Sequence, residues 1–168
     1  MGRTILVIGS ARSGKSQIAE TRTLGFGLRA TYIATAEPRD AEMAARIAAH
    51  QARRGEGWVT HAEPLDLTGA LAATDGSGPR LVDCLTLWLT NLMLGGHDWR
   101  LEGRALASAL QQQSDPVVIV TNEVGGGIVP DNALAREFRD AAGILNQWVA
   151  SVADEVILTV AGLPLKVK

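Results

Sequence analysis

The segment GSARSGKS, residues 9–16, follows a β-branched stretch at residues 4–8 and decides the fold of this chain. It fills the pattern G-x-x-x-x-G-K-[ST] of a phosphate-binding loop. The pattern predicts a strand, a tight turn and a helix that opens near Gly14, so that backbone N–H groups and the helix dipole converge on a phosphate. The alternative is a chance match in a glycine-rich turn, and the preceding strand argues against it.

Four residues of this loop have distinct expected roles. Gly9 and Gly14 lack a Cβ and therefore permit close approach of the backbone to the phosphate. Lys15 is expected to reach the β and γ phosphates, and the Ser16 hydroxyl to hold Mg²⁺. The loop thus predicts binding of a nucleoside triphosphate.

A phosphate loop usually needs a second carboxylate for Mg²⁺, at the end of another strand. Asp83 ends the segment at 80–83, and Glu123 follows the segment at 117–121. Either could instead be an acidic helix cap or a loop residue. We favour Asp83 for the metal, whereas Glu123, ahead of three glycines, faces the acceptor substrate in our interpretation. The segment Gly125 to Gly127 fits a flexible turn equally well.

Short β-branched segments alternate with helical segments along the chain, which predicts an α/β fold with a mostly parallel sheet. The final segment, 165–168, is expected to return as an antiparallel edge strand. The expected strands are residues 4–8, 31–35, 80–83, 117–121 and 156–160. With 168 residues, the chain is expected to form one nucleotide-binding catalytic domain, residues 1–168.

The clearest expected helices lie at residues 40–54, 101–113 and 131–153. In the last of these, apolar residues recur at helical spacing, which predicts a stripe that is buried against the sheet. The residues of this stripe are Leu134, Phe138, Leu145, Trp148 and Val152.

Composition excludes several classes of protein. The 16 basic and 18 acidic residues give a net charge of −2, which argues against a nucleic-acid partner or a membrane surface. A single cysteine, Cys84, excludes an internal disulfide and a Cys-rich zinc site, and its apolar surroundings predict packing in the core. No apolar run is long enough to span a membrane. We therefore expect an unprocessed cytoplasmic protein without membrane insertion.

His50 is the candidate nucleophile. It follows Met43 and Ile47 at helical spacing, which predicts an inward-facing position on the helix at 40–54. Nearby positive charge favours the neutral, nucleophilic imidazole, and the same guanidinium groups could bind a triphosphate. That combination suits covalent nucleotidyl transfer. These guanidinium groups belong to Arg46, Arg53 and Arg54.

Helix geometry alone favours an ordinary half-buried or surface histidine on a basic helix for His50. His61 and His97 have weaker cases as functional residues, because both fall in expected loops without a surrounding cluster of charged residues. We expect both to be solvated polar residues.

Taken together, these motifs resemble the bifunctional adenosylcobinamide kinase / adenosylcobinamide-phosphate guanylyltransferase family of cobalamin biosynthesis. The resemblance covers nearly the whole chain. A phosphate loop alone is shared by many families, whereas the matching segments in this order are specific. They are GSARSGKS at 9–16, YIATAEP at 32–38, EMAARIAAH at 42–50, LVDCLTLWLTNL at 81–92, TNEVGGGIVP at 121–130, FRDAAGILNQ at 138–147 and the ending ADEVILTVAGLPLKVK.

The resemblance implies an enzyme with two successive activities. ATP or GTP phosphorylates the aminopropanol hydroxyl of adenosylcobinamide, and GTP then donates GMP to that phosphate, giving adenosylcobinamide-GDP. The guanylyl step of the family passes through a GMP-histidine, and the matching position is His50. The family is also similar to RecA-type P-loop folds and forms a trimer.

The resemblance also implies which residues contact the nucleotide. These are Gly9, Ser10, Ala11, Arg12, Ser13, Gly14, Lys15, Ser16, Ala34, Thr35, Ala36, Gln51, Ala52, Arg53, Arg54 and Asp83. One position departs from the family pattern. Four residues after Trp58 the family often has a nucleotide-contacting Glu, but this chain has Ala62 there and Glu63 next. Either Glu63 replaces that contact after a small loop shift, or the contact is lost.

Two other functions compete with the bifunctional enzyme. The first is a P-loop small-molecule kinase without guanylyl transfer. The second is a GTP-binding switch, which usually carries an N-K-x-D signature for guanine that this chain lacks.

Overall fold

One mixed sheet forms the centre of the molecule. The computed structural model describes residues 2–27 and 29–168, and for Arg46, His50 and Arg53 it describes the backbone only. The sheet within these ranges has the order β3-β2-β4-β5-β1-β6-β7, and neighbours are parallel except for β6 and β7. The strands are β1 (Thr4–Gly9), β2 (Ala30–Ala34), β3 (Trp58–Ala62), β4 (Arg80–Asp83), β5 (Val117–Asn122), β6 (Glu155–Val160) and β7 (Leu163–Lys166).

Helices connect the parallel strands. They are α1 (Lys15–Leu24), α2 (Ala41–Arg53), α3 (Leu67–Thr74), α4 (Leu85–Leu94), α5 (Trp99–Leu110) and α6 (Ala133–Val152). Four of them begin at a side chain that accepts a hydrogen bond from a backbone N–H group of the first turn, which satisfies a donor that has no partner within the helix. These capping residues are Asp40, Asp66, Asp98 and Asn132.

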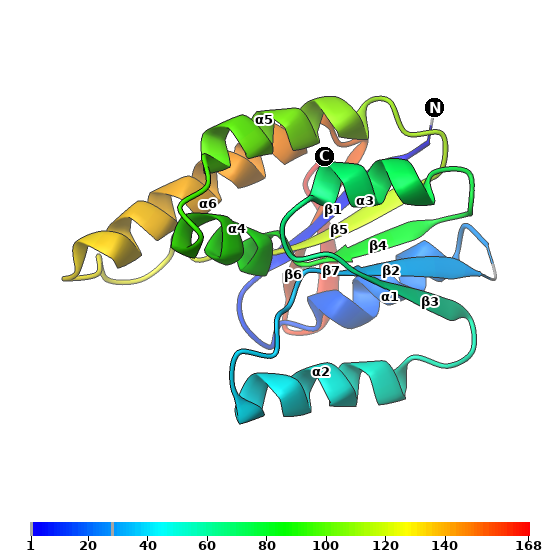
Figure 1. Cartoon of the computed structure of the whole chain (residues 1–168), viewed down its shortest axis with the longest axis horizontal. Coiled ribbons are helices and arrows are strands. Elements are labelled where there is room, and N and C mark those ends of the chain that lie inside the picture. Colours follow the sequence, from blue (N-terminus) through cyan, green and yellow to red (C-terminus); the bar gives the residue numbers. More distant parts are fainter. Residues whose placement is uncertain (1, 28) are drawn as a thin grey trace.

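The helices form two layers around the sheet. Figure 1 shows α1 and α2 below the sheet and α3, α4, α5 and α6 above it. The buried side chains follow this division, since Ile5 and Val7 of β1 pack with Ala19 of α1, whereas Leu6 faces a larger cluster that includes Leu89 of α4. Both faces of β1 are therefore apolar, as expected for a central parallel strand.

The sequence-based fold class is confirmed. All five expected parallel strands are present, and the antiparallel edge strand is β7, shifted to Leu163–Lys166. Strand β3 was not predicted. It lies at the edge of the described sheet, pairs with β2 and leaves Val59 and Thr60 exposed, so its sequence contains no buried apolar run. His61 was predicted to lie in a loop; this is wrong, because His61 is a half-buried residue of β3.

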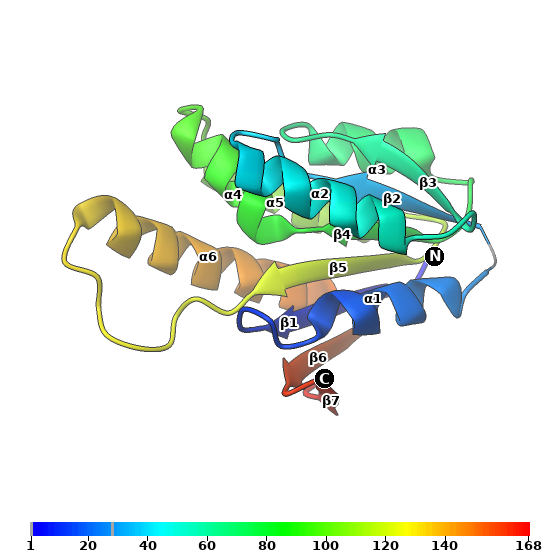
Figure 2. The same cartoon turned by 90° about the horizontal axis from the view of Figure 1, so that it is seen from below.

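The apolar stripe predicted for α6 is partly wrong. Leu145 is buried, and Phe138, Trp148 and Val152 pack at the border of the core, but Leu134 is 56% exposed. Figure 2 shows the reason, because the first turns of α6 extend beyond the sheet and have no layer beneath them. Spacing correctly identifies one face of the helix but cannot show where the covering sheet ends.

A buried arginine fixes the edge of the sheet at which the parallel strands begin. Arg80, the first residue of β4, is fully buried. Its Nη1 donates to Leu71 O at 3.0 Å and to Gln113 Oε1 at 2.7 Å, and its Nη2 donates to Asp115 O at 2.7 Å. Nη2 also lies 3.0 Å from Asp75 Oδ1. One guanidinium thus joins α3, β4 and the segments that follow α3 and α5.

We expect Arg80→Ala to lower the free energy of unfolding by about 3–5 kcal/mol, because several buried acceptors and a carboxylate would lose their shared donor. Urea unfolding of the wild type and the variant measures this difference. Arg29→Ala removes an exposed guanidinium and is the matched control. A loss below about 1 kcal/mol in Arg80→Ala would contradict the assigned role.

The carboxylate of Asp75 makes part of this stability dependent on pH. Burial by itself raises the pKa of Asp75, but N–H donors of Asp115 and Ser114 and the charge of Arg80 outweigh it, so the pKa lies below its ordinary value. A depressed carboxyl pKa stabilises the folded state above the unfolded-state pKa, and that contribution is lost as pH falls through the folded-state pKa. We expect Asp75→Asn to be less stable than the wild type at neutral pH and the difference to shrink below about pH 4. Unfolding titrations between neutral and acidic pH measure it, and a constant difference would exclude the linkage.

Candidate functional site

The turn between β1 and α1 has the geometry of an anion cradle. A Cβ on Gly9 would lie 2.5 Å from Ser13 Oγ and 2.8 Å from Thr159 O, so only glycine fits there. Gly14, directly before α1, has φ +91°, a backbone conformation that favours glycine. The first turn of α1 leaves backbone N–H groups without partners within the helix, and a phosphate can accept hydrogen bonds from such groups.

Lys15 folds back over this turn. Its Nζ donates to Ser10 O at 3.0 Å, which holds the ammonium group beside the backbone N–H groups of the loop. Ser16, the next residue, borders the same cavity as Lys15. The loop therefore offers a cation, a hydroxyl and backbone donors together, as the sequence pattern predicts.

A cavity of about 250 Å³ lies next to the phosphate loop. The strands beside it contribute Ala34 at the end of β2, Asp83 at the end of β4 and Asn122 at the end of β5. The carboxyl ends of parallel strands meet at one edge of a sheet, and ligands of open α/β sheets bind there. A second cavity, of about 530 Å³, lies around Thr4 at the opposite end of β1 and contains none of the predicted site residues.

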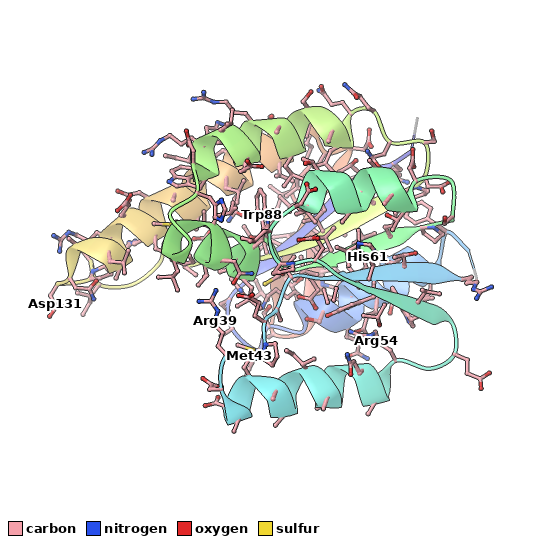
Figure 3. All side chains as sticks on the ribbon, in the orientation of Figure 1. Arg39, Met43, Arg54, His61, Trp88 and Asp131 are labelled. Atoms are coloured by element: carbon pink, nitrogen blue, oxygen red, sulfur yellow. The ribbon has the colours of Figure 1, made fainter. Side chains whose placement is uncertain are left out.

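Helix α2 closes the other side of the cavity. Met43, Ile47, Gln51 and Arg54 recur at helical spacing, and all four line the cavity. Figure 3 shows Met43 and Arg54 on the sheet side of α2, near its two ends. The inward face predicted for α2 from Met43 and Ile47 is thereby confirmed.

Position 50 belongs to this helix, three residues after Ile47 and one before Gln51. The side chains of Arg46, His50 and Arg53 lie outside the described part of the structure. Their expected roles therefore stay predictions, and the described neighbours Ile47, Gln51 and Arg54 show only which side of α2 faces the cavity.

Asp83 has a specific partner on β2. The hydroxyl of Tyr32 donates to Asp83 Oδ2 at 2.9 Å. Burial, and next the charge of Asp83, raise the pKa of Tyr32 above its ordinary value, so the phenol stays protonated and remains a donor. Tyr32 was not among the residues expected from the sequence. Its position two residues before Ala34, on a strand whose carboxyl end borders the cavity, was the available signal.

Arg54 packs on the aromatic ring of the same tyrosine. Its Cζ lies 3.3 Å from the centroid of the Tyr32 ring, in a cation–π contact. Its Nη1 is buried, and no partner for it exists among the described atoms. A buried guanidinium donor at the wall of a cavity is suited to an anionic ligand such as a phosphate.

Cys84 lines the cavity next to Asp83, and Thr35 supports it from behind. Thr35 Oγ1 accepts a hydrogen bond from Cys84 N and donates one to Cys84 O, both at 2.8 Å. Burial raises the pKa of the Cys84 thiol to about 12, so Cys84 is protonated at neutral pH and is a packing residue, as expected. The Thr35 side chain joins β2 to the end of β4 and does not line the cavity.

The remaining predicted nucleotide contacts divide into two groups. Ala34, Ala36, Gln51, Arg54 and Asp83 line the cavity together with Lys15 and Ser16. Other predicted contacts lie outside its lining: Ser10, Ala11 and Arg12 are exposed on the phosphate loop, and Ala52 is exposed on α2. Asn122 lines the cavity and was not expected, although it ends a parallel strand.

The carboxylates of Glu123 and Glu63 both accept hydrogen bonds from backbone N–H groups of their own loops. Glu123 Oε1 accepts from Gly125 N, and Glu123 does not line the cavity, which favours Asp83 as the carboxylate near the phosphate loop. Glu63 Oε1 accepts from Leu65 N at 2.9 Å and Asp66 N at 2.8 Å. In this conformation the Glu63 carboxylate caps a turn, and whether Glu63 replaces the family contact absent at Ala62 stays an open prediction.

The oxygen atoms at this edge suit Mg²⁺. Ser16 and Asp83 line one cavity and supply a hydroxyl and a carboxylate. Across the described side chains, no group of three or more His, Cys, Asp or Glu could hold a metal ion. Mg²⁺ usually binds to one or two carboxylates together with substrate phosphates and water, so these two residues fit a nucleotide-bound Mg²⁺.

Comparison with known proteins agrees with this geometry. Residues 5–167 match the family model described as "Cobinamide kinase / cobinamide phosphate guanyltransferase". A "Bifunctional adenosylcobalamin biosynthesis protein CobP" from Pseudomonas aeruginosa is 46% identical over 166 residues, covering 97% of this chain and 96% of that protein. The corresponding CobU proteins of Salmonella typhimurium and Escherichia coli are 45% and 42% identical, each covering 98% of this chain and 99% of their own length.

The P4 protein from bacteriophage phi6 in complex with ADP, a solved structure, aligns with a TM-score of 0.48 and 18% identity, covering 97% of this chain and 54% of that chain. That similarity is too low to bear on function. Within residues 2–27 and 29–168, no helix is long and apolar enough to cross a membrane. The full-length family match and the three relatives establish that this chain belongs to the cobinamide kinase / cobinamide phosphate guanyltransferase family.

Proposed function

We propose that this chain phosphorylates adenosylcobinamide with ATP or GTP and then transfers GMP from GTP to adenosylcobinamide phosphate through a GMP-histidine at His50. The observation that carries the proposal is the single cavity that borders Lys15, Ser16, Asp83 and the helix containing His50. Residues 1–168 act as one catalytic domain in this proposal. We extend it, on the family resemblance, to a cytoplasmic homotrimer.

In the kinase step, the acceptor hydroxyl oxygen attacks the γ-phosphorus. The bond from that phosphorus to the β–γ bridging oxygen breaks, the nucleoside diphosphate leaves and the hydroxyl proton is released. Lys15 and the N–H groups of the phosphate loop hold the β and γ phosphates during this transfer. Mg²⁺, when bound with Ser16 and Asp83, would offset further negative charge on the phosphates.

In the guanylyl step, an imidazole nitrogen of His50 attacks the α-phosphorus of GTP. A P–N bond forms, the bond to the α–β bridging oxygen breaks and pyrophosphate leaves. An oxygen of adenosylcobinamide phosphate then attacks the same phosphorus and the P–N bond breaks. The guanidinium of Arg54, with a buried Nη1, is suited to hold a phosphate while charge builds up.

Labelling with GTP that carries ³²P at the α phosphate tests this step. We expect an acid-labile, protein-bound label in the wild type that is absent in His50→Ala, because the P–N bond needs the imidazole. His97→Ala changes an exposed loop histidine and is the control. If no label becomes protein-bound in the wild type while the kinase reaction proceeds, the chain is a P-loop kinase without guanylyl transfer.

We expect Lys15→Ala to reduce both activities by about 10²- to 10³-fold, because one preorganised cation beside the transferred phosphates is lost. Lys166→Ala, which changes an exposed lysine of β7, is the matched control. Steady-state rates of product formation measure the two reactions separately. Retention of full activity by Lys15→Ala would show that the cradle at residues 9–16 does not bind the reacting phosphates.

A further inference from the structure

Tyr32 makes contact with charged groups from two different elements. The side chain lies in β2, is 5% exposed and packs edge-on against Trp58, with ring centroids 6.1 Å apart. It also lines the cavity beside the phosphate loop. The ring is therefore fixed by the sheet, whereas its hydroxyl and one face remain available to groups around the cavity.

The hydroxyl of Tyr32 donates a hydrogen bond to the carboxylate of Asp83. It donates to Asp83 Oδ2 at 2.9 Å across the parallel pair of β2 and β4, in which Ala34 is the register partner of Asp83. A buried hydroxyl costs free energy unless it has a partner, and a phenylalanine would fill the same space without that cost. Packing alone does not account for the hydroxyl, whereas orientation of the Asp83 carboxylate does.

The face of the Tyr32 ring contacts the guanidinium group of Arg54. Arg54 follows the last residue of α2, and its Cζ lies 3.3 Å from the ring centroid. A long arginine side chain loses much rotamer freedom when it binds a ligand, and a flat aromatic surface reduces that loss by holding the group beforehand. In Figure 3, Arg54 lies between α2 and the sheet, where this contact joins the helix to the sheet.

We propose that Tyr32 is a positioning residue that orients Asp83 through its hydroxyl and Arg54 through its ring, and so prepares the metal-binding carboxylate and a phosphate-binding cation together. This inference rests on the proposed function for the roles of Asp83 and Arg54. The two contacts can be changed one at a time, because the hydrogen bond to Asp83 comes from the hydroxyl and the cation–π contact with Arg54 from the ring face.

Calorimetric titration of GTP, with EDTA and with Mg²⁺, separates the effects of the two contacts without any turnover. Tyr32→Phe keeps the ring and removes the hydroxyl, so we expect the GTP affinity in EDTA to stay unchanged and the gain in affinity on adding Mg²⁺ to fall by about 2- to 10-fold. Tyr32→Leu also removes the ring face, and we expect the GTP affinity in EDTA to fall by about 2- to 30-fold.

A double-mutant cycle tests whether the hydroxyl acts through the carboxylate. In the background Asp83→Asn, Tyr32→Phe should no longer change the effect of Mg²⁺ on GTP binding. Thr74→Val removes another buried hydroxyl, which donates to Ala70 O within α3, and serves as the control for a purely structural loss. We expect Thr74→Val to change thermal stability without changing GTP binding in either buffer.

The inference is overturned if Tyr32→Phe lowers the melting temperature but matches the wild type in GTP affinity and Mg²⁺ response. It is also overturned if the effect of Tyr32→Phe persists in the Asp83→Asn background. Because Tyr32→Phe is nearly isosteric, it provides the decision even if Tyr32→Leu does not fold. Failure of the proposed function is a separate result, namely a wild-type protein that binds GTP but never carries a GMP label.

Discussion

The reversal of the chain after β1 is the constraint on which the site depends. Backbone N–H groups must point toward one phosphate, and this requires Gly9 to pass within contact distance of Ser13 and Thr159. The turn is supported from the other end of the chain, because Gly162 N donates to Ser13 O at 2.8 Å. The phosphate loop, although recognised from a local sequence pattern, is thus also held by the hairpin of β6 and β7.

Because most strands pair in parallel, their carboxyl ends lie at one edge of the sheet and their amino ends at the opposite edge, and the two edges differ in function. At the carboxyl edge, the phosphate loop, Asp83 and Asn122 surround a cavity, and their polar groups are available to a ligand. At the amino edge, Arg80 uses its guanidinium on internal acceptors from several segments and is fully buried. The four-residue strand β4 therefore carries the cavity residue Asp83 at one end and the buried, stabilising Arg80 at the other.

Within the cavity, charged groups are held by contacts between elements. The Lys15 ammonium is held by a carbonyl of its own loop, whereas Arg54 and Asp83 are both held by Tyr32. The family relation assigns two phosphate-transfer reactions to such a site, and both need cations whose position is set before the substrate arrives. Tyr32, a residue of the sheet, contacts both Arg54 at the end of α2 and Asp83 at the end of β4.

The sequence by itself determined the phosphate loop, the α/β class and the family, because these depend on local spacing and on the order of motifs. It favoured Asp83 over Glu123 as the metal-binding carboxylate, which stays a prediction; Asp83 lines the cavity beside the phosphate loop and Glu123 does not. Only the tertiary structure decided that β3 is a strand, that Leu134 is exposed and that Tyr32 joins two charged groups. Edge pairing, the extent of a covering layer and contacts between distant strands depend on neighbours that are remote in sequence, and local periodicity carries no information about them.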